Sequence, residues 1–304
     1  MDLLFLIKKF LRMFSNKVEL LDCIQGLKNI KDNTIDTIIC DPPYNIGKDF
    51  GNDSDKQDMQ KYFEWCKEWI FESYRVLKEG GSIFIYGFSE ILAQIFVDIP
   101  FSTKKWLVWH YTNKTVPSSK DWQRSHESII HLWKGKKIFN LDDIRESYTE
   151  NFIKNAAGKV RKPTKGRYSN GDKETIYLAN EMGAMPRDVI KVPALAGGSG
   201  GVERWFYCEN CEKAFEPKQK KQHESHKTFT HPTQKPFELT KKLLLSSIPK
   251  NSVPKIIVPF AGSGSELVVS KILGYEFVGY DINPKYVEFA NSWLEQVETK
   301  NPTY

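Results

Sequence analysis

Cysteine is scarce in this chain, which has five among its 304 residues. Three of them, Cys23, Cys40 and Cys66, are scattered along the sequence, so a disulfide framework is not expected. Long apolar runs are also missing, since none reaches the roughly 18 residues that a transmembrane helix needs. These absences favour a cytoplasmic protein with no membrane partner.

The N-terminus lacks the residue order of a secretory signal peptide. Residues 1–12 are largely apolar, but their positive charges, Lys8, Lys9 and Arg12, follow the apolar part instead of preceding it. Two interpretations of residues 1–17 stay open. Either they form an N-terminal extension with a surface helix, or translation naturally begins at Met13.

Apolar and basic residues, by contrast, are well represented. An apolar content of 40% and an aromatic content of 13% can fill a sizeable core. The net charge of +6 suits a polyanionic partner. Part of the excess lies in one stretch, which is either a solvated loop or, as we favour, a loop that contacts phosphates: Lys154, Lys159, Arg161, Lys162, Lys165, Arg167 and Lys173.

Apolar runs alternate with helical patterns along most of the chain. The expected strands are residues 18–21, 35–40, 82–86, 105–111, 127–133, 255–258 and 276–279, and the expected helices are 23–30, 57–77, 90–96, 237–247, 265–273 and 284–297. The alternation predicts an α/β fold with a doubly wound, mostly parallel sheet. Glu79-Gly80-Gly81 is expected to end the helix 57–77. Between residues 135 and 230 the periodicity fades, which predicts an insertion between two parts of one domain, 18–134 and 231–304.

A proline-rich motif follows the strand expected at 35–40. It reads Asp41-Pro42-Pro43-Tyr44. In parallel sheets, ligands bind at the carboxyl ends of strands. The prolines remove two N–H donors and stiffen the backbone, which leaves the Asp41 carboxylate and the Pro42 carbonyl as fixed acceptors beside the aromatic face of Tyr44. The alternative is a proline-stiffened turn without a catalytic role.

A glycine loop, Phe260-Ala261-Gly262-Ser263-Gly264-Ser265, follows the strand expected at 255–258. Glycines allow close backbone approach, and the helix that follows offers free N–H donors at its start. Asp281, after the next strand, is placed to accept hydrogen bonds from ribose hydroxyls. We favour a nucleotide-like ligand here over a structural glycine turn with a surface Asp.

The inserted region contains a candidate metal site. Cys208 and Cys211 are followed by His223 and His226, with eleven residues between the two pairs. Tetrahedral zinc takes four such sulfur and nitrogen ligands. We favour a structural zinc that staples the inserted region, because no open position for catalysis is implied. The alternative is a reduced Cys pair beside two surface His residues.

The motifs and their order resemble the β-class DNA amino-methyltransferases, in which the catalytic motif precedes the target-recognition region and the cofactor loop follows it. The resemblance spans about 18–295 and rests on these segments: Leu21-Asp22-Cys23, Ile39-Cys40-Asp41-Pro42-Pro43-Tyr44-Asn45, Leu77-Lys78-Glu79-Gly80-Gly81, Ser125-His126-Glu127, His231-Pro232-Thr233-Gln234-Lys235-Pro236, Pro259-Phe260-Ala261-Gly262-Ser263-Gly264-Ser265 and Gly279-Tyr280-Asp281-Ile282-Asn283-Pro284. It implies S-adenosylmethionine as the methyl donor and double-stranded DNA as the substrate, recognised by the inserted region at 135–230.

The resemblance also implies which residues bind the cofactor. Asp22 and Cys23 would contact its adenine, Asp281 its ribose, and the glycine loop its methionine portion. The whole expected set is Asp22, Cys23, Asp41, His231, Thr233, Lys235, Phe260, Gly262, Ser263, Gly264, Ser265 and Asp281. One departure concerns Val258, which stands where the family usually has Asp. Any polar contact made from that position to the cofactor's amino-acid end is lost.

In the family that this chain resembles, members with Asp before Pro-Pro-Tyr mostly methylate adenine N6, so the resemblance implies adenine as the target, with the base flipped out of the duplex. Asp41, Pro42 and Tyr44 are then the catalytic residues, because two acceptors that grip both amino N–H bonds make an aryl amine more nucleophilic. Cytosine N4 methylation, an RNA target and a catalytically silent DNA-binding module stay open as alternatives. No cysteine follows a proline, which excludes the Pro-Cys nucleophile that methylates cytosine at carbon five. The resemblance further suggests a homodimer, a cognate restriction endonuclease, and a nucleoid-associated protein of bacterial, archaeal or phage origin.

Overall fold

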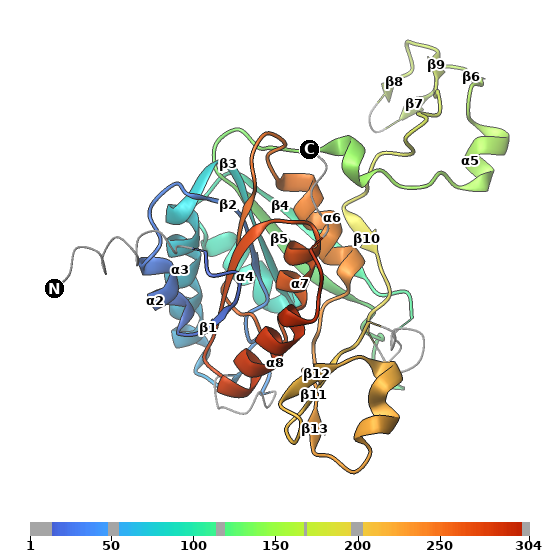
Figure 1. Cartoon of the computed structure of the whole chain (residues 1–304). Coiled ribbons are helices and arrows are strands. Elements are labelled where there is room, and N and C mark those ends of the chain that lie inside the picture. The colour runs from blue at the N-terminus through green and yellow to red at the C-terminus, as the bar shows by residue number, and fades with distance from the viewer. Residues whose placement is uncertain (1–13, 48–54, 114–118, 167–168, 196–202, 300–304) are drawn as a thin grey trace. The chain divides into compact units, whose positions relative to one another are not determined.

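The computed structural model describes residues 14–47, 55–113, 119–166, 169–195 and 203–299 (Figure 1). The expectations for the first 13 residues, and for Arg167 in the basic stretch, lie outside the described residues. Within these ranges no helix is both long and apolar enough to cross a bilayer. The described residues before 140 and after 187 form one compact unit, and residues 140–187 form another.

A mixed sheet of eight strands forms the centre of the larger unit. Its spatial order is β1 (Val18–Leu20), β15 (Glu276–Asp281), β14 (Lys255–Val258), β2 (Ile35–Cys40), β3 (Leu77–Gly87), β5 (His126–Trp133), β4 (Lys104–His110) and β10 (Val189–Lys191). Neighbouring strands run parallel except in the pairs β3–β5 and β5–β4. The prediction of an α/β fold with a mostly parallel sheet is therefore confirmed.

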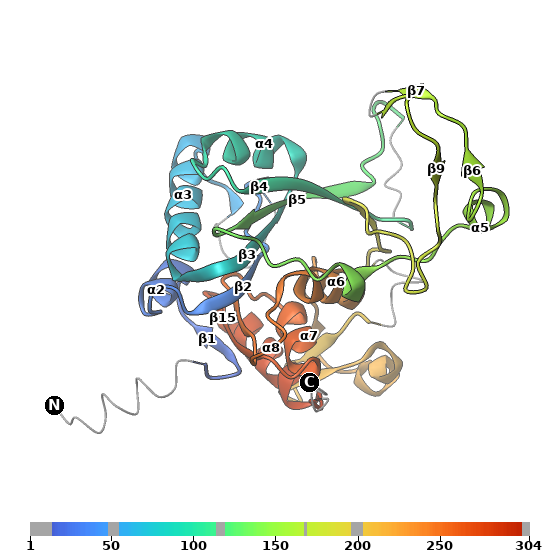
Figure 2. The same cartoon turned by 90° about the horizontal axis from the view of Figure 1, so that it is seen from above.

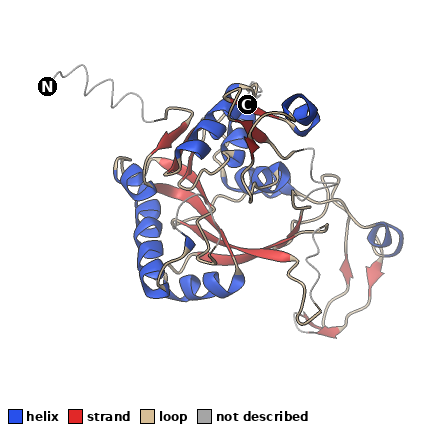
Figure 3. Cartoon of the chain, turned by 90° about the horizontal axis from the view of Figure 1, so that it is seen from below, coloured by secondary structure: helices blue, strands red, loops and turns tan. Residues whose placement is uncertain are grey.

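Helices pack on both faces of this sheet (Figures 2 and 3). One face carries α2 (Cys23–Lys28), α3 (Met59–Val76) and α4 (Ser89–Asp98), and the other carries α6 (Phe237–Ser247), α7 (Ser265–Ile272) and α8 (Pro284–Glu295). The apolar stripes of these helices fill two core layers, in which Trp69 of α3 and Trp293 of α8 are fully buried. Burying a large apolar side chain contributes about 1.5–3 kcal/mol, so these stripes hold the helices against the sheet.

Most predicted element boundaries lie within a few residues of the observed ones, and one prediction is wrong. Glu79-Gly80-Gly81 does not end the helix, because α3 stops at Val76 and the extended backbone of Leu77 begins β3 directly. The register of β3 against β2 shifts between Leu77 and Ser82, so the glycines lie at a bulge. Gly80 has a φ of +83° there, a conformation that glycine adopts without strain.

The smaller unit is built from short elements. It contains η2 (Leu141–Ile144), α5 (Glu150–Asn155), a pair of β6 (Val160–Arg161) with β9 (Thr175–Ile176), and a pair of β7 (Lys165–Gly166) with β8 (Ser169–Asn170). This unit covers fewer residues, 140–187, than the insertion expected at 135–230. The rest of that range belongs to the larger unit, including β10 and a small sheet of β11 (Phe206–Cys208), β12 (Lys213–Phe215) and β13 (Thr228–Phe229) with the helical turn η3 (Pro217–His223).

Candidate active site

The strand order explains how residues far apart in the sequence form one site. β2 and β14 are parallel neighbours, so the residues that follow them, Asp41 and Phe260, meet at the same edge of the sheet. β15 lies next to β14 and ends at Asp281, and β1 lies next to β15 and leads to Asp22. Carboxylates and the glycine loop are therefore gathered at one edge.

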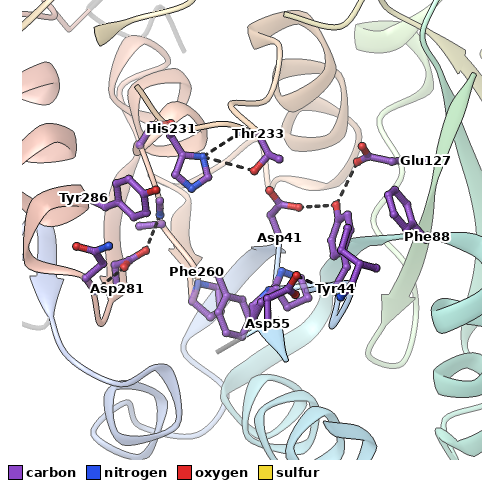
Figure 4. Close-up of a pocket in the computed structure, with 18 of the residues that line it drawn as sticks. Asp41, Tyr44, Asp55, Phe88, Glu127, His231, Thr233, Phe260, Asp281 and Tyr286 are labelled. Atoms are coloured by element: carbon purple, nitrogen blue, oxygen red, sulfur yellow. Dashed lines mark hydrogen bonds between the residues drawn. The ribbon is translucent and has the colours of Figure 1, made fainter. Parts of the chain in front are cut away.

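A cavity of about 730 Å³ opens at this edge (Figure 4). Its volume falls within the range of about 300–1,000 Å³ that is usual for small-molecule sites. Two residues of the expected set are not among its lining: Lys235 is buried beside Asp41, and Gly264 caps the start of α7. The other expected residues line it: Asp22, Cys23, Asp41, Pro42, Tyr44, His231, Thr233, Phe260, Gly262, Ser263, Ser265 and Asp281.

Asp41 is held by two side chains from different parts of the chain. The Tyr44 hydroxyl donates to Asp41 Oδ1 at 2.7 Å and also lies 3.1 Å from Glu127 Oε2. Lys235 Nζ donates to Asp41 Oδ2 at 2.5 Å and lies 3.8 Å from Glu127 Oε2. Each Asp41 oxygen thus has a protein donor, and a carboxylate oxygen can accept a further hydrogen bond on its second lone pair.

Burial and charge fix the protonation states around Asp41. Burial by itself lowers the pKa of the Lys235 ammonium, but the Asp41 and Glu127 carboxylates outweigh it and raise that pKa above its ordinary value. Burial and the same two carboxylates raise the pKa of the Tyr44 phenol, which therefore stays a donor. The site contains a charged lysine and a neutral tyrosine that both point hydrogen-bond donors at Asp41.

The backbone after the Pro-Pro-Tyr motif is held by polar side chains. The Tyr62 hydroxyl of α3 donates to the Pro43 carbonyl at 2.8 Å. Asn45 has a φ of +57°, and its N–H and that of Ile46 both donate to the buried Asp55 carboxylate. Because these contacts fix the loop on both sides of Tyr44, the geometry around Asp41 is set before any ligand binds.

The opposite wall of the cavity is formed by the glycine loop and the end of β15. Asp281 accepts the Gly262 N–H on Oδ2 and the Asn283 N–H on Oδ1, each at 2.8 Å. Burial raises the pKa of the Asp281 carboxyl, and these N–H donors oppose the rise. Gly262 has a φ of +50°, and a Cβ on it would lie 2.8 Å from His231 Nε2. Only glycine fits at this point of the wall.

Aromatic and capping contacts shape the part of the cavity next to α2 and α3. The Phe260 ring meets Trp65 and Trp69 edge-on, with centroid separations of 5.5 and 5.2 Å. The Asp22 carboxylate caps α2 by accepting two backbone N–H groups. Burial raises the pKa of the Cys23 thiol, so Cys23 offers packing surface and not a nucleophile.

Comparison with known proteins identifies the family. A family model described as DNA methylase, covering N6 and N4 enzymes, matches residues 35–292. This chain belongs to the N6/N4 DNA methylase family. The match spans Asp41, the glycine loop and Asp281, which line the cavity.

Individual relatives agree with this assignment. The methylase is 30% identical to the type II methyltransferase M.HpaI of Haemophilus parainfluenzae over 280 residues, which are 90% of this chain and 72% of the relative. It is 29% identical to the DNA adenine methyltransferase YhdJ of Escherichia coli K12, over 88% of this chain and 79% of the relative. The PvuII DNA methyltransferase, described as cytosine-N4-specific, shares the fold with a TM-score of 0.58 at 12% identity, over 93% of this chain and 87% of that one.

The sequence analysis gave no role in the site to two acidic residues of this methylase, although one of them, Glu127, lies in a segment that carries the family resemblance. Glu127 lies at the start of β5, where it shares Tyr44 and Lys235 with Asp41. Glu266 lies in the first turn of α7, lines the cavity and is only 3% exposed. Burial first, and then the Asp41 charge, raise the pKa of Glu266 to about 7. Both residues stand at the start of a largely apolar strand or helix. An acidic residue at such a position is the sequence signal that could have identified them as candidate site residues.

The structure also brings together the four residues expected to bind a metal. One potential ligand atom from each of Cys208, Cys211, His223 and His226 lies within 4.8 Å of the other three. This cluster belongs to the larger unit, together with the sheet and the cavity, and not to residues 140–187.

Proposed function

We propose that this methylase transfers a methyl group from S-adenosylmethionine to N6 of a flipped-out adenine at a specific site in double-stranded DNA, within a restriction–modification system. The observation that carries the proposal is the Asp41 carboxylate, paired with a buried ammonium at the wall of a cavity whose opposite wall is a glycine loop and Asp281. The type II and adenine methyltransferases among its relatives support this reading.

The residues present fit the cofactor. Asp281 stands where a ribose would meet an acceptor, and the glycine loop leaves room for close approach of the ligand. Val258, where the family usually has Asp, is buried in β14 and offers no polar atom. We assign the role of that missing Asp to the buried Glu266 carboxyl, which lines the cavity and would contact the cofactor's amino group.

Asp41 and its neighbours would hold the target amine. The Asp41 carboxylate and the Pro42 carbonyl would accept the two N–H bonds of the amine, which localises the nitrogen lone pair. Lys235 holds the Asp41 carboxylate in place, and Tyr44 offers a ring face against the base. S-adenosylmethionine supplies an electrophilic methyl group. Positioning is then the main catalytic effect, since effective molarities for well-oriented reactants reach about 10⁵ M or more.

DNA recognition is assigned to the region between the two halves of the catalytic domain. In the unit 140–187 several basic side chains are exposed, including Lys159, Arg161 and Lys162. Such side chains suit phosphate contacts, which fix the register of a protein on the duplex. A homodimer and a cognate endonuclease remain predictions from the family resemblance.

Substitution of Asp41 tests the proposal. Asp41→Ala is expected to abolish methylation in a radiolabelled-methyl assay while S-adenosylmethionine still binds in calorimetry. Asp41→Asn is the matched variant, because it keeps the packing around Lys235 and removes only the charge. It should also bind the cofactor without turning over. Methyl transfer by either variant at the wild-type rate would remove Asp41 from the mechanism.

Cytosine N4 methylation is the second candidate, because the N4-specific PvuII enzyme has the same fold. Mass spectrometry of nucleosides from treated DNA separates N6-methyladenine from N4-methylcytosine.

A catalytically silent DNA-binding module is the third candidate function, and Val258 is the feature that favours it. Calorimetric titration with S-adenosylmethionine decides this point, because a silent module with a lost cofactor contact would give no binding heat.

A further inference from the structure

The Cys208, Cys211, His223 and His226 cluster has the dimensions of a tetrahedral metal site. His226 Nδ1 lies 3.4 Å from Cys208 Sγ and 3.3 Å from Cys211 Sγ, and His223 Nδ1 lies 3.8 Å from Cys211 Sγ. Zinc bonds of about 2.3 Å to sulfur and about 2.05 Å to nitrogen, at the tetrahedral angle, place sulfur and nitrogen about 3.6 Å apart. The three measured separations lie around this value.

The backbone around the cluster presents the ligands from two short elements. Cys208 ends β11, and Cys211 lies in the tight turn to β12, where Glu212 adopts a φ of +49°. His223 ends η3, and the His226 N–H donates to the His223 carbonyl at 3.0 Å. A hairpin turn and a helical end thus face each other, as they do around structural zinc with two Cys and two His ligands.

The small sheet is attached to α8, which also borders the cavity. The Ala214 N–H of β12 donates to Ser292 Oγ at 2.9 Å. Lys285, near the start of α8, pairs with Glu209 in the turn between the two cysteines at 2.7 Å. Tyr286, the next residue of α8, lines the cavity.

The strands of the small sheet also border the segment that contains His231 and Lys235. Thr230, directly after β13, donates from Oγ1 to the Trp205 carbonyl just before β11 at 2.7 Å. The Gln234 amide accepts the Trp205 N–H at 3.0 Å and donates to the Trp205 carbonyl at 2.7 Å. The small sheet therefore helps to hold residues 231–235, in addition to the contact of Lys235 with Asp41.

We propose that Cys208, Cys211, His223 and His226 bind one structural zinc ion, and that this ion holds the 231–235 segment in its cofactor-binding position. The four ligands lie between the end of β11 and the start of β13, so the ion closes the chain that joins these two paired strands, and β13 leads directly into this segment. A metal that binds only the folded chain stabilises it, and here the stabilised part continues directly into the wall of the cavity. The coupling half of this proposal rests on the proposed function, since it requires S-adenosylmethionine as the ligand.

The experiment measures metal content and cofactor affinity separately in the full-length protein. Elemental analysis of protein purified without chelators should give one zinc per chain, and exchange with cobalt should give the visible absorption of a tetrahedral thiolate site. Cys211→Ser should lose both signals. Glu224→Gln, which changes an exposed residue between the two His ligands, is the matched control and should keep them.

Cofactor affinity tests the coupling. Removing zinc from the wild-type protein with a chelator should weaken S-adenosylmethionine binding in calorimetry about tenfold, equivalent to about 1.4 kcal/mol, and adding zinc back should restore it. Cys211→Ser should show the weaker binding whether or not zinc is added. Absence of zinc and of a cobalt spectrum would overturn the metal site. Zinc that is present but can be removed without weakening the cofactor would overturn the coupling.

A zinc-loaded protein that never binds S-adenosylmethionine would overturn the coupling and contradict the proposed function. The metal site would still be established by its zinc content and cobalt spectrum, so the two failures are distinguishable. Thermal unfolding of Cys211→Ser, with and without cofactor, shows whether that variant is folded at the temperature of the titration.

Discussion

Lys235→Met would remove the ammonium that faces Asp41 while keeping an apolar side chain of similar length. The Lys235 side chain is 2% exposed and that of Asp41 is 12% exposed, so little solvent is available to replace the lost charge. Removing one partner of a buried ion pair costs about 3–5 kcal/mol, because the other charge is left uncompensated. For a protein of this size such a loss lowers the unfolding temperature by about 10 °C.

Thermal unfolding followed by circular dichroism measures this loss of stability. Two further variants serve as a control and as a test of the coupling between the two charges. Lys78→Met is the matched control: Lys78 pairs with Asp36 at 2.9 Å, but its side chain is 36% exposed and Asp36 keeps the Lys255 N–H as a donor. We expect a smaller loss there. Lys235→Met combined with Asp41→Asn removes both charges, so it should be more stable than Lys235→Met alone.

The same variant should also slow methylation, because the Asp41 carboxylate loses the ammonium that holds its Oδ2. The radiolabelled-methyl assay measures this loss. A Lys235→Met protein with wild-type stability, no coupling to Asp41→Asn and the wild-type rate would refute the ion pair as the support of Asp41.

Three further predictions concern other parts of the cavity. Glu266→Gln should reduce the dependence of stability on pH. The folded-state pKa is raised from 4.5 to about 7, so the stability that the protonated carboxyl contributes is complete below about 4.5 and is lost as the pH rises to about 7. The free energy of unfolding that is lost amounts to about 3 kcal/mol. If the unfolding temperatures of the wild-type protein and of Glu266→Gln changed equally between pH 5 and 8, this prediction would be contradicted. Gly262→Ala should weaken S-adenosylmethionine binding in calorimetry, because its Cβ would displace His231 and its φ of +50° is strained for alanine; unchanged affinity would show that the loop can shift freely. Trp122 lines the cavity and is 95% exposed, so Trp122→Ala should weaken DNA binding in a fluorescence titration by about 1–3 kcal/mol through lost stacking, with cofactor affinity unchanged; equal DNA affinity would exclude that contact.

The sequence by itself determined the secondary structure and its class, because the spacing of apolar residues records which face of each element is buried. The strands 35–40 and 255–258 and the helix 237–247 were predicted with the observed limits. The positions of Asp41, the glycine loop and Asp281 at strand ends followed from the same pattern. The sequence also contained the metal-ligand spacing, which needs only residue types and counts.

Only the tertiary structure decided which of these residues touch. Lys235 was expected beside the cofactor, and its ammonium faces Asp41, 194 positions earlier in the chain, because α6, which begins two residues after Lys235, packs against β2 and β3. The burial that gives Glu266 its raised pKa depends on helix packing, which periodicity cannot resolve atom by atom. The attachment of the Cys208, Cys211, His223 and His226 cluster to the catalytic unit likewise comes from contacts with α8, which no local pattern encodes. Local sequence sets the elements and their exposed faces, and the pairing of distant side chains depends on how the sheet orders its strands.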